Sequence, residues 1–279
     1  MMRRVQLSAA FALSLAASAC SFATTGMQRA LDPSMERILA VTAYLQTASG
    51  ITGDARRIVR GDGYIYLADV GPQLRYMAMT GDSASYRILR RFAEREMVRR
   101  DSSGFALRHR YRQGAPFEKA TPFGVLRFTE ALALGWRTFG DTASAVLAAQ
   151  MAPVAPLGGE RTETDRVAEE CVNAEVSLAS NPAAAAAVLA KNRRYDGRHD
   201  LYAESTLGLR GNDAELVALS CLVRVGLATK DADATVRHLD KLLDRLDPIL
   251  AQSGRPDPGA ASDVLWALRQ ATAAGPKYR

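Results

Sequence analysis

The chain has 279 residues, of which 48% are hydrophobic and 24% charged, a composition typical of a globular protein rather than a disordered one. Its formal net charge is +6, from 36 Lys and Arg against 30 Asp and Glu, and these charges are interspersed along the chain. So mild an excess does not indicate nucleic-acid binding. No segment after the first twenty residues is apolar and long enough to predict a transmembrane helix.

The first twenty residues have the pattern of an export signal. Arg3 and Arg4 form a basic start, and residues 7–19 are an apolar run too short to span a bilayer. The run ends in the small residues Ala17-Ser18-Ala19, a cleavage pattern that Cys20 follows directly. Without the signal the net charge is +4, because 34 basic side chains (36 minus 2) face 30 acidic ones.

The position of Cys20 resembles the lipobox of bacterial lipoproteins, in which the cysteine is lipidated and becomes the mature N-terminus. Ala17 departs from that pattern, where leucine is usual, so an ordinary signal peptide that ends beside a cysteine is the alternative. We therefore predict a signal over 1–20, a tether over 21–33 and a single domain over 34–279. The predicted location is the periplasm, with a membrane anchor if Cys20 is modified.

Apolar residues recur at helical spacing through most of the predicted domain. Between them, residues 104–114 alternate apolar and polar, which predicts one strand or half of a hairpin. The sequence around Pro72 favours a helix that starts near Val70, because proline fits the first turn. The fold class is all-α, with helices expected over 33–46, 65–79, 83–99, 122–139, 144–151, 162–177, 182–191, 213–228, 232–246 and 260–273.

Three helix–turn–helix joints have related sequences: Gly81-Asp82-Ser83, Gly140-Asp141-Thr142 and Lys230-Asp231-Ala232. Glycine can take the left-handed conformation that ends a helix, and the aspartate can cap the helix that follows. The joints are 59 residues apart (81 to 140) and then 90 apart (140 to 230). This spacing is too long for a 34-residue repeat and indicates larger helical hairpins.

Cys171 and Cys221 fall on two predicted helices. An oxidising compartment would allow them to pair, and two free buried cysteines are the alternative, since the sequence does not set the distance between them. His109, His199 and His238 are isolated from one another, and no cluster of His and Cys has the spacing of metal ligands. We expect neither a metal nor a cofactor.

One stretch of about eighty residues, 62–141, combines several of these features in order. After a Gly- and Asp-rich start comes a helix ending at Gly81-Asp82, then a second helix, a short extended piece over 104–108, and a Lys119-Ala120-Thr121 turn before a helix ending at Gly140-Asp141. This order resembles the front part of family 8 glycoside hydrolases, bacterial endoglucanase-type (α/α)6 toroids. The resemblance implies a toroid, complete or incomplete, built of helical hairpins.

The catalytic acids of that family are not kept in this sequence. The family carries one acid in a Ser-Glu-Gly-Gln-like segment, where this chain has Leu67-Ala68-Asp69-Val70-Gly71, with Asp69 one position away. The second acid follows an Ala-Thr turn as Asp-Ala-Asp, where this chain continues as Pro122-Phe123-Gly124. The catalytic pair is therefore lost or relocated, and whether the protein is an enzyme stays open.

Inverting glycoside hydrolysis needs two carboxylates roughly 6.5–9.5 Å apart. The candidates are Asp62, Asp69 and Glu118, for which the plainer alternatives are a turn aspartate, a helix cap and a pair with Lys119. Trp136 and Trp266 fall at helical spacing and are expected in the core. Candidates for substrate binding are Tyr64, Tyr66, Tyr202 and Glu204, together with Arg108, Arg110 and Arg112, which would share one strand face suited to an anionic polysaccharide or form a charged strand edge.

Three functions are compatible with these features. The first is an exported carbohydrate-active protein that acts on or binds a bacterial polysaccharide and is glycoside hydrolase-like if active. The second is a toroid-like lipoprotein without catalysis that assists exopolysaccharide export or assembly. The third is a helical scaffold that binds another envelope protein. The expected partners are a polysaccharide or oligosaccharide, and the membrane through an N-terminal lipid, with no nucleic acid.

Overall fold

The computed structural model describes residues 33–48, 54–102, 104–151, 162–197, 211–251 and 256–274. Its contacts divide the chain into two units, 1–37 and 38–279, and all contacts below lie within the second. The predicted signal and most of the predicted tether lie outside the described residues. So do three predicted site residues, Cys20, Tyr202 and Glu204.

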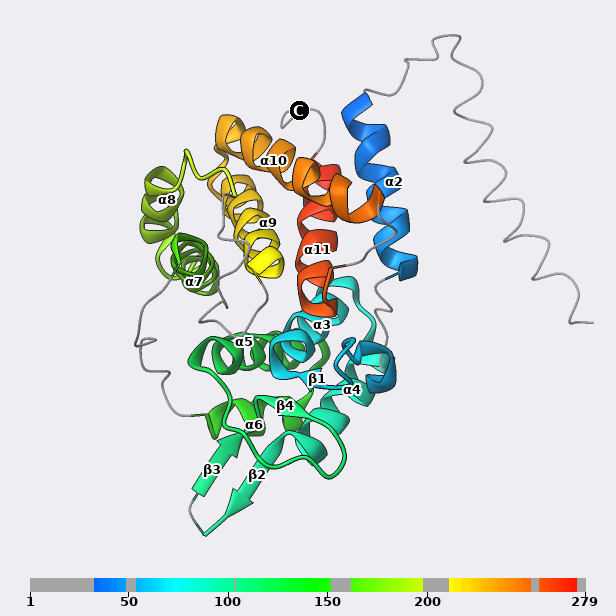
Figure 1. Cartoon of the computed structure of the whole chain (residues 1–279). Coiled ribbons are helices and arrows are strands. Elements are labelled where there is room, and N and C mark those ends of the chain that lie inside the picture. Colours follow the sequence, from blue (N-terminus) through cyan, green and yellow to red (C-terminus); the bar gives the residue numbers. More distant parts are fainter. Residues whose placement is uncertain are drawn as a thin grey trace, which may run out of the picture. The chain divides into compact units, whose positions relative to one another are not determined.

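The described chain is mostly helical, which confirms the all-α prediction (Figure 1). Two helices, α5 and α8, have the predicted bounds to the residue. The helices are α2 (Pro33–Ala48), α3 (Leu67–Thr80), α4 (Ser83–Glu96), α5 (Pro122–Phe139), α6 (Thr142–Ala149), α7 (Glu163–Val176), α8 (Pro182–Lys191), α9 (Gly211–Thr229), α10 (Ala232–Ala251) and α11 (Pro258–Ala274), with a 3-10 turn η1 at Ala55–Ile58.

The three predicted joints connect α3 to α4, α5 to α6 and α9 to α10. Each has its turn residue in the left-handed region, with φ of 78° at Gly81, 64° at Gly140 and 60° at Lys230. Lysine at the third joint adopts this conformation without the freedom of glycine. The shared turn geometry explains why the third joint, with lysine in place of glycine, builds the same kind of hairpin as the other two.

The aspartates of the joints cap the helices that follow, with one variation. The Asp82 Oδ1 accepts the Ser85 N–H at 3.0 Å, and the Asp231 Oδ1 accepts the Ala234 N–H at 3.0 Å. At the second joint, the Ser144 hydroxyl donates a hydrogen bond to Asp141 Oδ2 at 2.6 Å instead. Two of the three predicted caps therefore satisfy a free backbone N–H directly.

Helix α3 begins at Leu67, earlier than the start near Val70 that Pro72 favours in the sequence. The Leu67 N–H donates to the His109 carbonyl oxygen at 2.9 Å, which anchors the first turn to the neighbouring chain segment. Pro72 therefore lies inside the helix and leaves the Ala68 carbonyl without its usual i+4 donor. Contacts distant in sequence decided where this helix starts.

The region 98–111 contains more strand than the single strand or half hairpin that the sequence predicts. Strand β2 (Val98–Asp101) pairs antiparallel with β3 (Gly104–Leu107), and β1 (Ile65–Tyr66) pairs with β4 (Arg110–Tyr111). The helix predicted to reach residue 99 ends at Glu96, because the residues from Val98 onward pair with β3 instead.

Alternate helices along the chain pack against one another. Helix α3 packs against α5 and α11, while α9 packs against α7 and α11 and lies between them (Figure 1). Helices α4, α6 and α10 each pack against the helix that precedes them, and α8 packs against both α7 and α9. The five helices α3, α5, α7, α9 and α11 therefore form a contacting series in the spatial order α5, α3, α11, α9, α7, with α4, α6, α8 and α10 against it.

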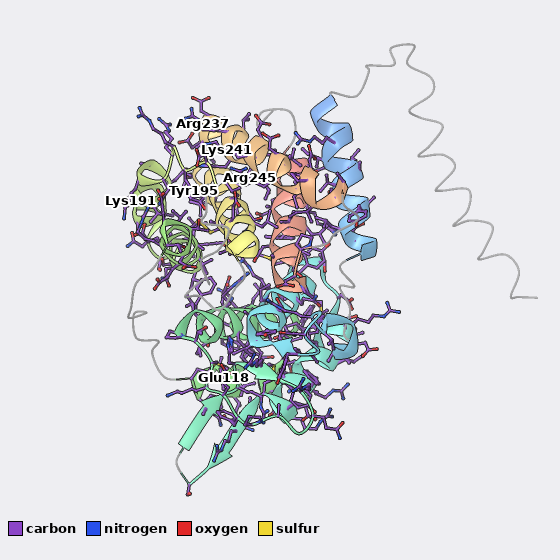
Figure 2. All side chains as sticks on the ribbon, viewed as in Figure 1. Glu118, Lys191, Tyr195, Arg237, Lys241 and Arg245 are labelled. Atoms are coloured by element: carbon purple, nitrogen blue, oxygen red, sulfur yellow. A yellow bond between two sulfur atoms is a disulfide. The ribbon has the colours of Figure 1, made fainter. Side chains whose placement is uncertain are left out.

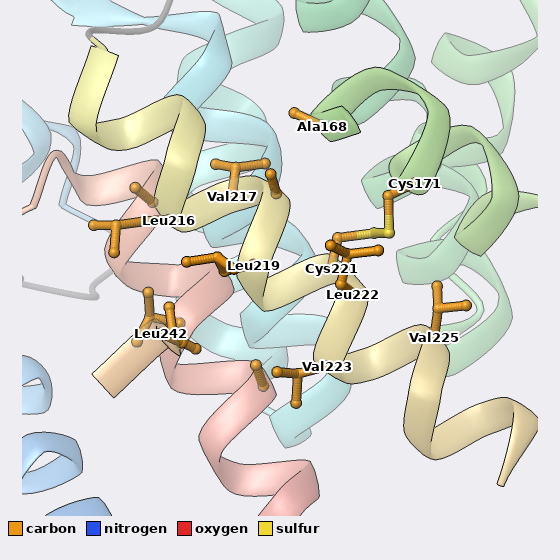
Figure 3. Packing of buried hydrophobic residues seen from close by; sticks show 14 of the residues in the cluster. Ala168, Cys171, Leu216, Val217, Leu219, Cys221, Leu222, Val223, Val225 and Leu242 are labelled. Carbon is orange, nitrogen blue, oxygen red and sulfur yellow. A yellow bond between two sulfur atoms is a disulfide. The ribbon is translucent and has the colours of Figure 1, made fainter. Parts of the chain in front are cut away.

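Two hydrophobic clusters stabilise this arrangement. One includes Leu219 of α9, Leu243 of α10 and Leu268 of α11, and the other includes Leu74 of α3 and Phe128 of α5. Within the first cluster, aliphatic side chains of α9 precede and follow the residue that forms a covalent link to α7 (Figure 3).

That link is a disulfide between Cys171 of α7 and Cys221 of α9, whose Cα atoms are 6.0 Å apart. Both cysteines are fully buried. The structure thus selects pairing over two free thiols, the alternatives that the sequence leaves open. Of the helices in the described chain, none is both long and apolar enough to cross a membrane.

Candidate functional site

The predicted catalytic residue Asp62 lies in an exposed turn and is held by its own neighbours. The Tyr66 hydroxyl donates to Asp62 Oδ2 at 2.6 Å, and the Tyr64 N–H donates to Oδ1 at 3.1 Å. Burial is the main cause that raises the pKa of Tyr66, and its hydrogen bond with Asp62 adds to the rise. This geometry is that of a turn aspartate that orders two tyrosines.

Asp69, the second predicted catalytic residue, is 0% exposed. Arg60 donates to both of its oxygens, at 2.7 Å from Nε to Oδ2 and 2.9 Å from Nη2 to Oδ1. The Gly259 N–H donates to Oδ1 at 3.0 Å, so the carboxylate caps the first turn of α11 rather than its own helix. A side chain so enclosed holds two helices together and is not offered to a substrate.

The third predicted acid, Glu118, is exposed and pairs with Arg110 rather than with Lys119, at 2.8 Å from Nε to Oε2. Arg110 and Arg112 both lie over the Tyr64 ring, with Cζ 4.7 Å and 4.3 Å from its centroid. Arg108 is engaged elsewhere, because its Nη1 donates to the Ala115 carbonyl oxygen at 3.1 Å. Two of the three predicted arginines therefore share a surface with Tyr64.

Figure 2 shows Glu118 near the strands, apart from the other labelled polar side chains around α8 and α10. Among the latter, Lys241 Nζ donates to the Tyr195 carbonyl oxygen at 2.9 Å and Arg245 Nη2 to the Asp196 carbonyl oxygen at 3.3 Å. These two cations hold the segment after α8 against α10, which is a structural role.

A different cluster brings together ionic side chains from all five helices of the contacting series. They are Arg75 of α3, Glu130 of α5, Glu175 of α7, Arg224 of α9 and Asp263 of α11. Arg75 pairs with Glu175 through Nη2, and its Nε lies 3.2 Å from Glu130 Oε1. Arg75 therefore links two carboxylates that belong to different helices.

Arg224 binds Glu175 in a bidentate manner, with Nε and Nη2 donating to the two carboxylate oxygens at 2.7 Å and 2.8 Å. The Nη1 of Arg224 lies 3.6 Å from Asp263 Oδ1, and Arg127 of α5 pairs with Asp263 Oδ2. The ionic cluster, defined as Arg75, Arg127, Arg224, Glu130, Glu175 and Asp263, thus has three cations and three anions.

The pKa values of the two glutamates of the ionic cluster are shifted in opposite directions. Burial alone would raise the pKa of Glu175, but the charges and hydrogen bonds of Arg224 and Arg75 lower it to about 2. Burial raises the pKa of Glu130 above its usual value, and Arg75 opposes this rise only in part. Carboxylates with such divergent environments are found in acid–base pairs, and also in structural ion networks.

Four members of the ionic cluster, Arg75, Glu130, Glu175 and Arg224, line a cavity of about 590 Å³. The rest of its lining is largely apolar and includes Trp136, which is 50% exposed, so the prediction that this tryptophan lies in the core is wrong. Trp266 is partly buried and packs against the hydrophobic core, in edge contact with Tyr76. The cavity is lined by Arg75, Met79, Glu130, Ala133, Leu134, Trp136, Arg137, Glu175, Val176, Leu178, Ala179, Arg224, Ala228 and Gln270.

Three polar atoms of this lining have no hydrogen-bond partner in the described part of the chain. Arg75 Nε and Nη1 are donors on a side chain that is only 5% exposed, and Gln270 Oε1 is a buried acceptor. A buried polar atom without a partner costs about 1–3 kcal/mol, so such atoms mark places where a water molecule or a ligand belongs. The lining of the cavity therefore includes unsatisfied donors on Arg75 and an unsatisfied acceptor on Gln270.

A larger groove of about 990 Å³ lies beside α4 and includes Ile88, Phe92, Arg91 and Arg95 in its lining. The polar residues that line this groove are surface side chains. The polar residues that line the cavity over the ionic cluster come from five helices and are largely buried. The cavity over the ionic cluster is the better candidate, because buried polar groups that converge on an apolar pocket are typical of binding sites.

Sequence reasoning missed this site because its members belong to no motif and span residues 75 to 263. The available signal was a charged residue within an otherwise apolar run, as in Leu222-Val223-Arg224-Val225. Such a residue must find a buried partner, but the sequence does not say which.

Within the described ranges, no group of three or more His, Cys, Asp or Glu side chains could hold a metal ion. No protein-family model, curated protein or solved structure matches the chain.

Proposed function

We propose that this protein is an exported saccharide-binding protein, and that its helical hairpins form a toroid, complete or incomplete, with the ligand in the cavity over the ionic cluster. The alternation of α3, α5, α7, α9 and α11 with the other helices supports the toroid. In such an arrangement the inner helices converge on one site, and each of these five supplies a member of the ionic cluster.

The observation that carries the proposal is the position of Trp136. Its side chain is half exposed at a cavity whose other wall holds Arg75, Glu130 and Gln270. An indole ring can stack on the apolar face of a sugar, while guanidinium, carboxyl and amide groups bind the hydroxyls. The pocket thus combines an aromatic platform with hydrogen-bonding groups, as saccharide recognition requires.

Two features support export. The first twenty residues have the pattern of a signal peptide, and the Cys171–Cys221 disulfide suits an oxidising compartment such as the periplasm. Lipidation of Cys20 would hold the domain at a membrane, where it could assist the export or assembly of a polysaccharide.

Hydrolysis is the second candidate function, with Glu130 as the acid, because burial raises its pKa. Binding fits the geometry better, since inverting hydrolysis needs a second carboxylate to activate water. Both oxygens of Glu175 already accept hydrogen bonds from Arg224, and Asp69 is enclosed by Arg60 and Gly259.

Isothermal titration of the protein with a panel of neutral and acidic oligosaccharides tests the proposal. We expect at least one to bind, and Trp136→Ala to weaken that binding about thirtyfold, the loss of roughly 2 kcal/mol typical of a central aromatic contact. Ile88→Ala is the matched control, because Ile88 is also 50% exposed but lies in the groove beside α4.

The outcomes separate the candidate functions. Release of new reducing ends, abolished by Glu130→Gln, would establish hydrolysis in place of binding alone. Failure of every saccharide to bind at millimolar concentration would refute the proposal and leave a helical scaffold for another envelope protein.

A further inference from the structure

Arg137 lies in the last turn of α5, next to Trp136, and lines the same cavity. The side chain is exposed, and no residue of the described chain forms an ion pair with it. Because the ionic cluster is balanced at three cations and three anions, Arg137 adds one positive charge at the cavity that no described residue pairs with. This charge favours a ligand that carries one negative charge.

Arg75 contributes a second feature of the same kind. Its Nη2 donates to Glu175 and its Nε lies 3.2 Å from Glu130 without a hydrogen bond, while Nη1 has no acceptor among the described residues. The planar guanidinium is well matched to a carboxylate, and a charge-assisted hydrogen bond there would relieve the unsatisfied donor. Gln270 Oε1, on the same lining, requires a donor such as a sugar hydroxyl.

We infer that the cavity selects saccharides that contain a uronate residue, and that Arg137 and Arg75 recognise its carboxylate. This inference rests on the proposed function. A uronate supplies both the acceptor that Arg75 lacks and the hydroxyl donors that Gln270 lacks, and its ring can stack on Trp136. A dianionic phosphate fits less well, because Glu130 and Glu175 line the same cavity and would repel the additional charge.

The experiment uses three pairs of monosaccharides: galacturonate and galactose, glucuronate and glucose, mannuronate and mannose. Within each pair the sugars differ only in a carboxylate against a hydroxymethyl group. Calorimetric titration of the full domain is expected to show at least tenfold tighter binding of the uronate member in whichever pair binds.

Arg137→Gln is expected to reduce that preference to threefold or less, through weaker binding of the uronate member. Arg137 is exposed, so this variant keeps the buried ionic cluster intact. The matched control is Arg91→Gln, an exposed arginine on α4 that lies away from this cavity. Arg75→Lys is a secondary variant, since removing the buried guanidinium could also unfold the protein.

Equal or tighter binding of the neutral sugars, lost in Trp136→Ala, would overturn the uronate inference and leave the saccharide-binding proposal standing. An unchanged uronate preference in Arg137→Gln would overturn the role of Arg137. Failure of all six sugars to bind would refute both proposals.

Discussion

His238 shows how burial determines the chemistry of a single residue in this protein. The ring is fully buried on α10, its Nε2 lies 3.3 Å from the Asn192 carbonyl oxygen, and its Nδ1 has no hydrogen-bond partner in the described chain. Burial, together with the nearby charges of Lys241 and Arg237, lowers its pKa to about 4, although the Asn192 carbonyl opposes the shift. The native state thus holds this histidine neutral at pH values where an unfolded chain would protonate it.

The consequence is a specific loss of stability in acid. Above pH 6.5 the histidine is neutral in both states and has no effect, but between pH 6.5 and 4 only the unfolded chain binds the proton. The free energy of unfolding should therefore fall by about 3 kcal/mol across this range through His238 alone.

Urea unfolding of the wild type and of His238→Gln at several pH values measures this contribution. The difference in unfolding free energy between the two proteins should narrow or reverse as the pH falls from 6.5 to 4. Parallel pH profiles would show that His238 is not held neutral. His109→Gln is a useful comparison, since burial also lowers the pKa of that histidine.

At the scale of elements, the three joints depend on one backbone conformation rather than on one sequence. Gly81 and Gly140 have open space where a Cβ atom would be, so a side chain there would be strained only by the positive φ. Lys230 already accepts that strain at φ 60°. Variants at the joints therefore measure the free-energy cost of a positive φ separately from the effects of packing.

We expect Gly81→Ala and Gly140→Ala each to lower the unfolding free energy by about 1 kcal/mol, and Lys230→Gly to raise it by up to about the same amount. Gly61→Ala is the control, because Gly61 also has open space around it but no positive φ. Chemical denaturation measures all four variants. A decrease in the unfolding free energy for the alanine variants of these joints and an increase for Lys230→Gly would support the role of the positive φ. Changes of the same sign in all three variants would contradict it.

At the scale of the whole described domain, charge and covalent linkage hold together helices that are distant in the sequence. The ionic cluster connects five helices, and the disulfide joins α7 to α9 within the first hydrophobic cluster. Removing one member of a balanced buried network would leave an uncompensated charge, which is far more destabilising than losing a surface pair.

Reduction of the disulfide gives the corresponding measurement for the covalent link. The cysteines are separated by 50 residues, so the constraint on the unfolded chain contributes up to about 4 kcal/mol. Added reductant should lower the midpoint of thermal unfolding of the wild type and leave that of the Cys171→Ala/Cys221→Ala double variant unchanged. A wild type insensitive to reductant under conditions that expose both thiols would show that the link contributes nothing.

Local physics determined much of the helical framework from the sequence alone. Helices α5 and α8 have their predicted bounds because a capping Thr121 or Asn181 and a proline at the first helical position act within a few residues. The three joints were predictable for the same reason, since a turn residue and a following aspartate suffice to end one helix and start the next.

The tertiary structure decided whatever depended on distant partners. Asp69 was predicted as a candidate acid, but Arg60 and the start of α11 enclose it, and Trp136 was expected inside because helical spacing does not show which face another helix covers. The pairing of Cys171 with Cys221 and the convergence of four members of the ionic cluster on one cavity depend on how helices pack. The hydrophobic periodicity of the sequence predicts which residues are buried, whereas the packing of the helices determines which buried charged residues form ion pairs.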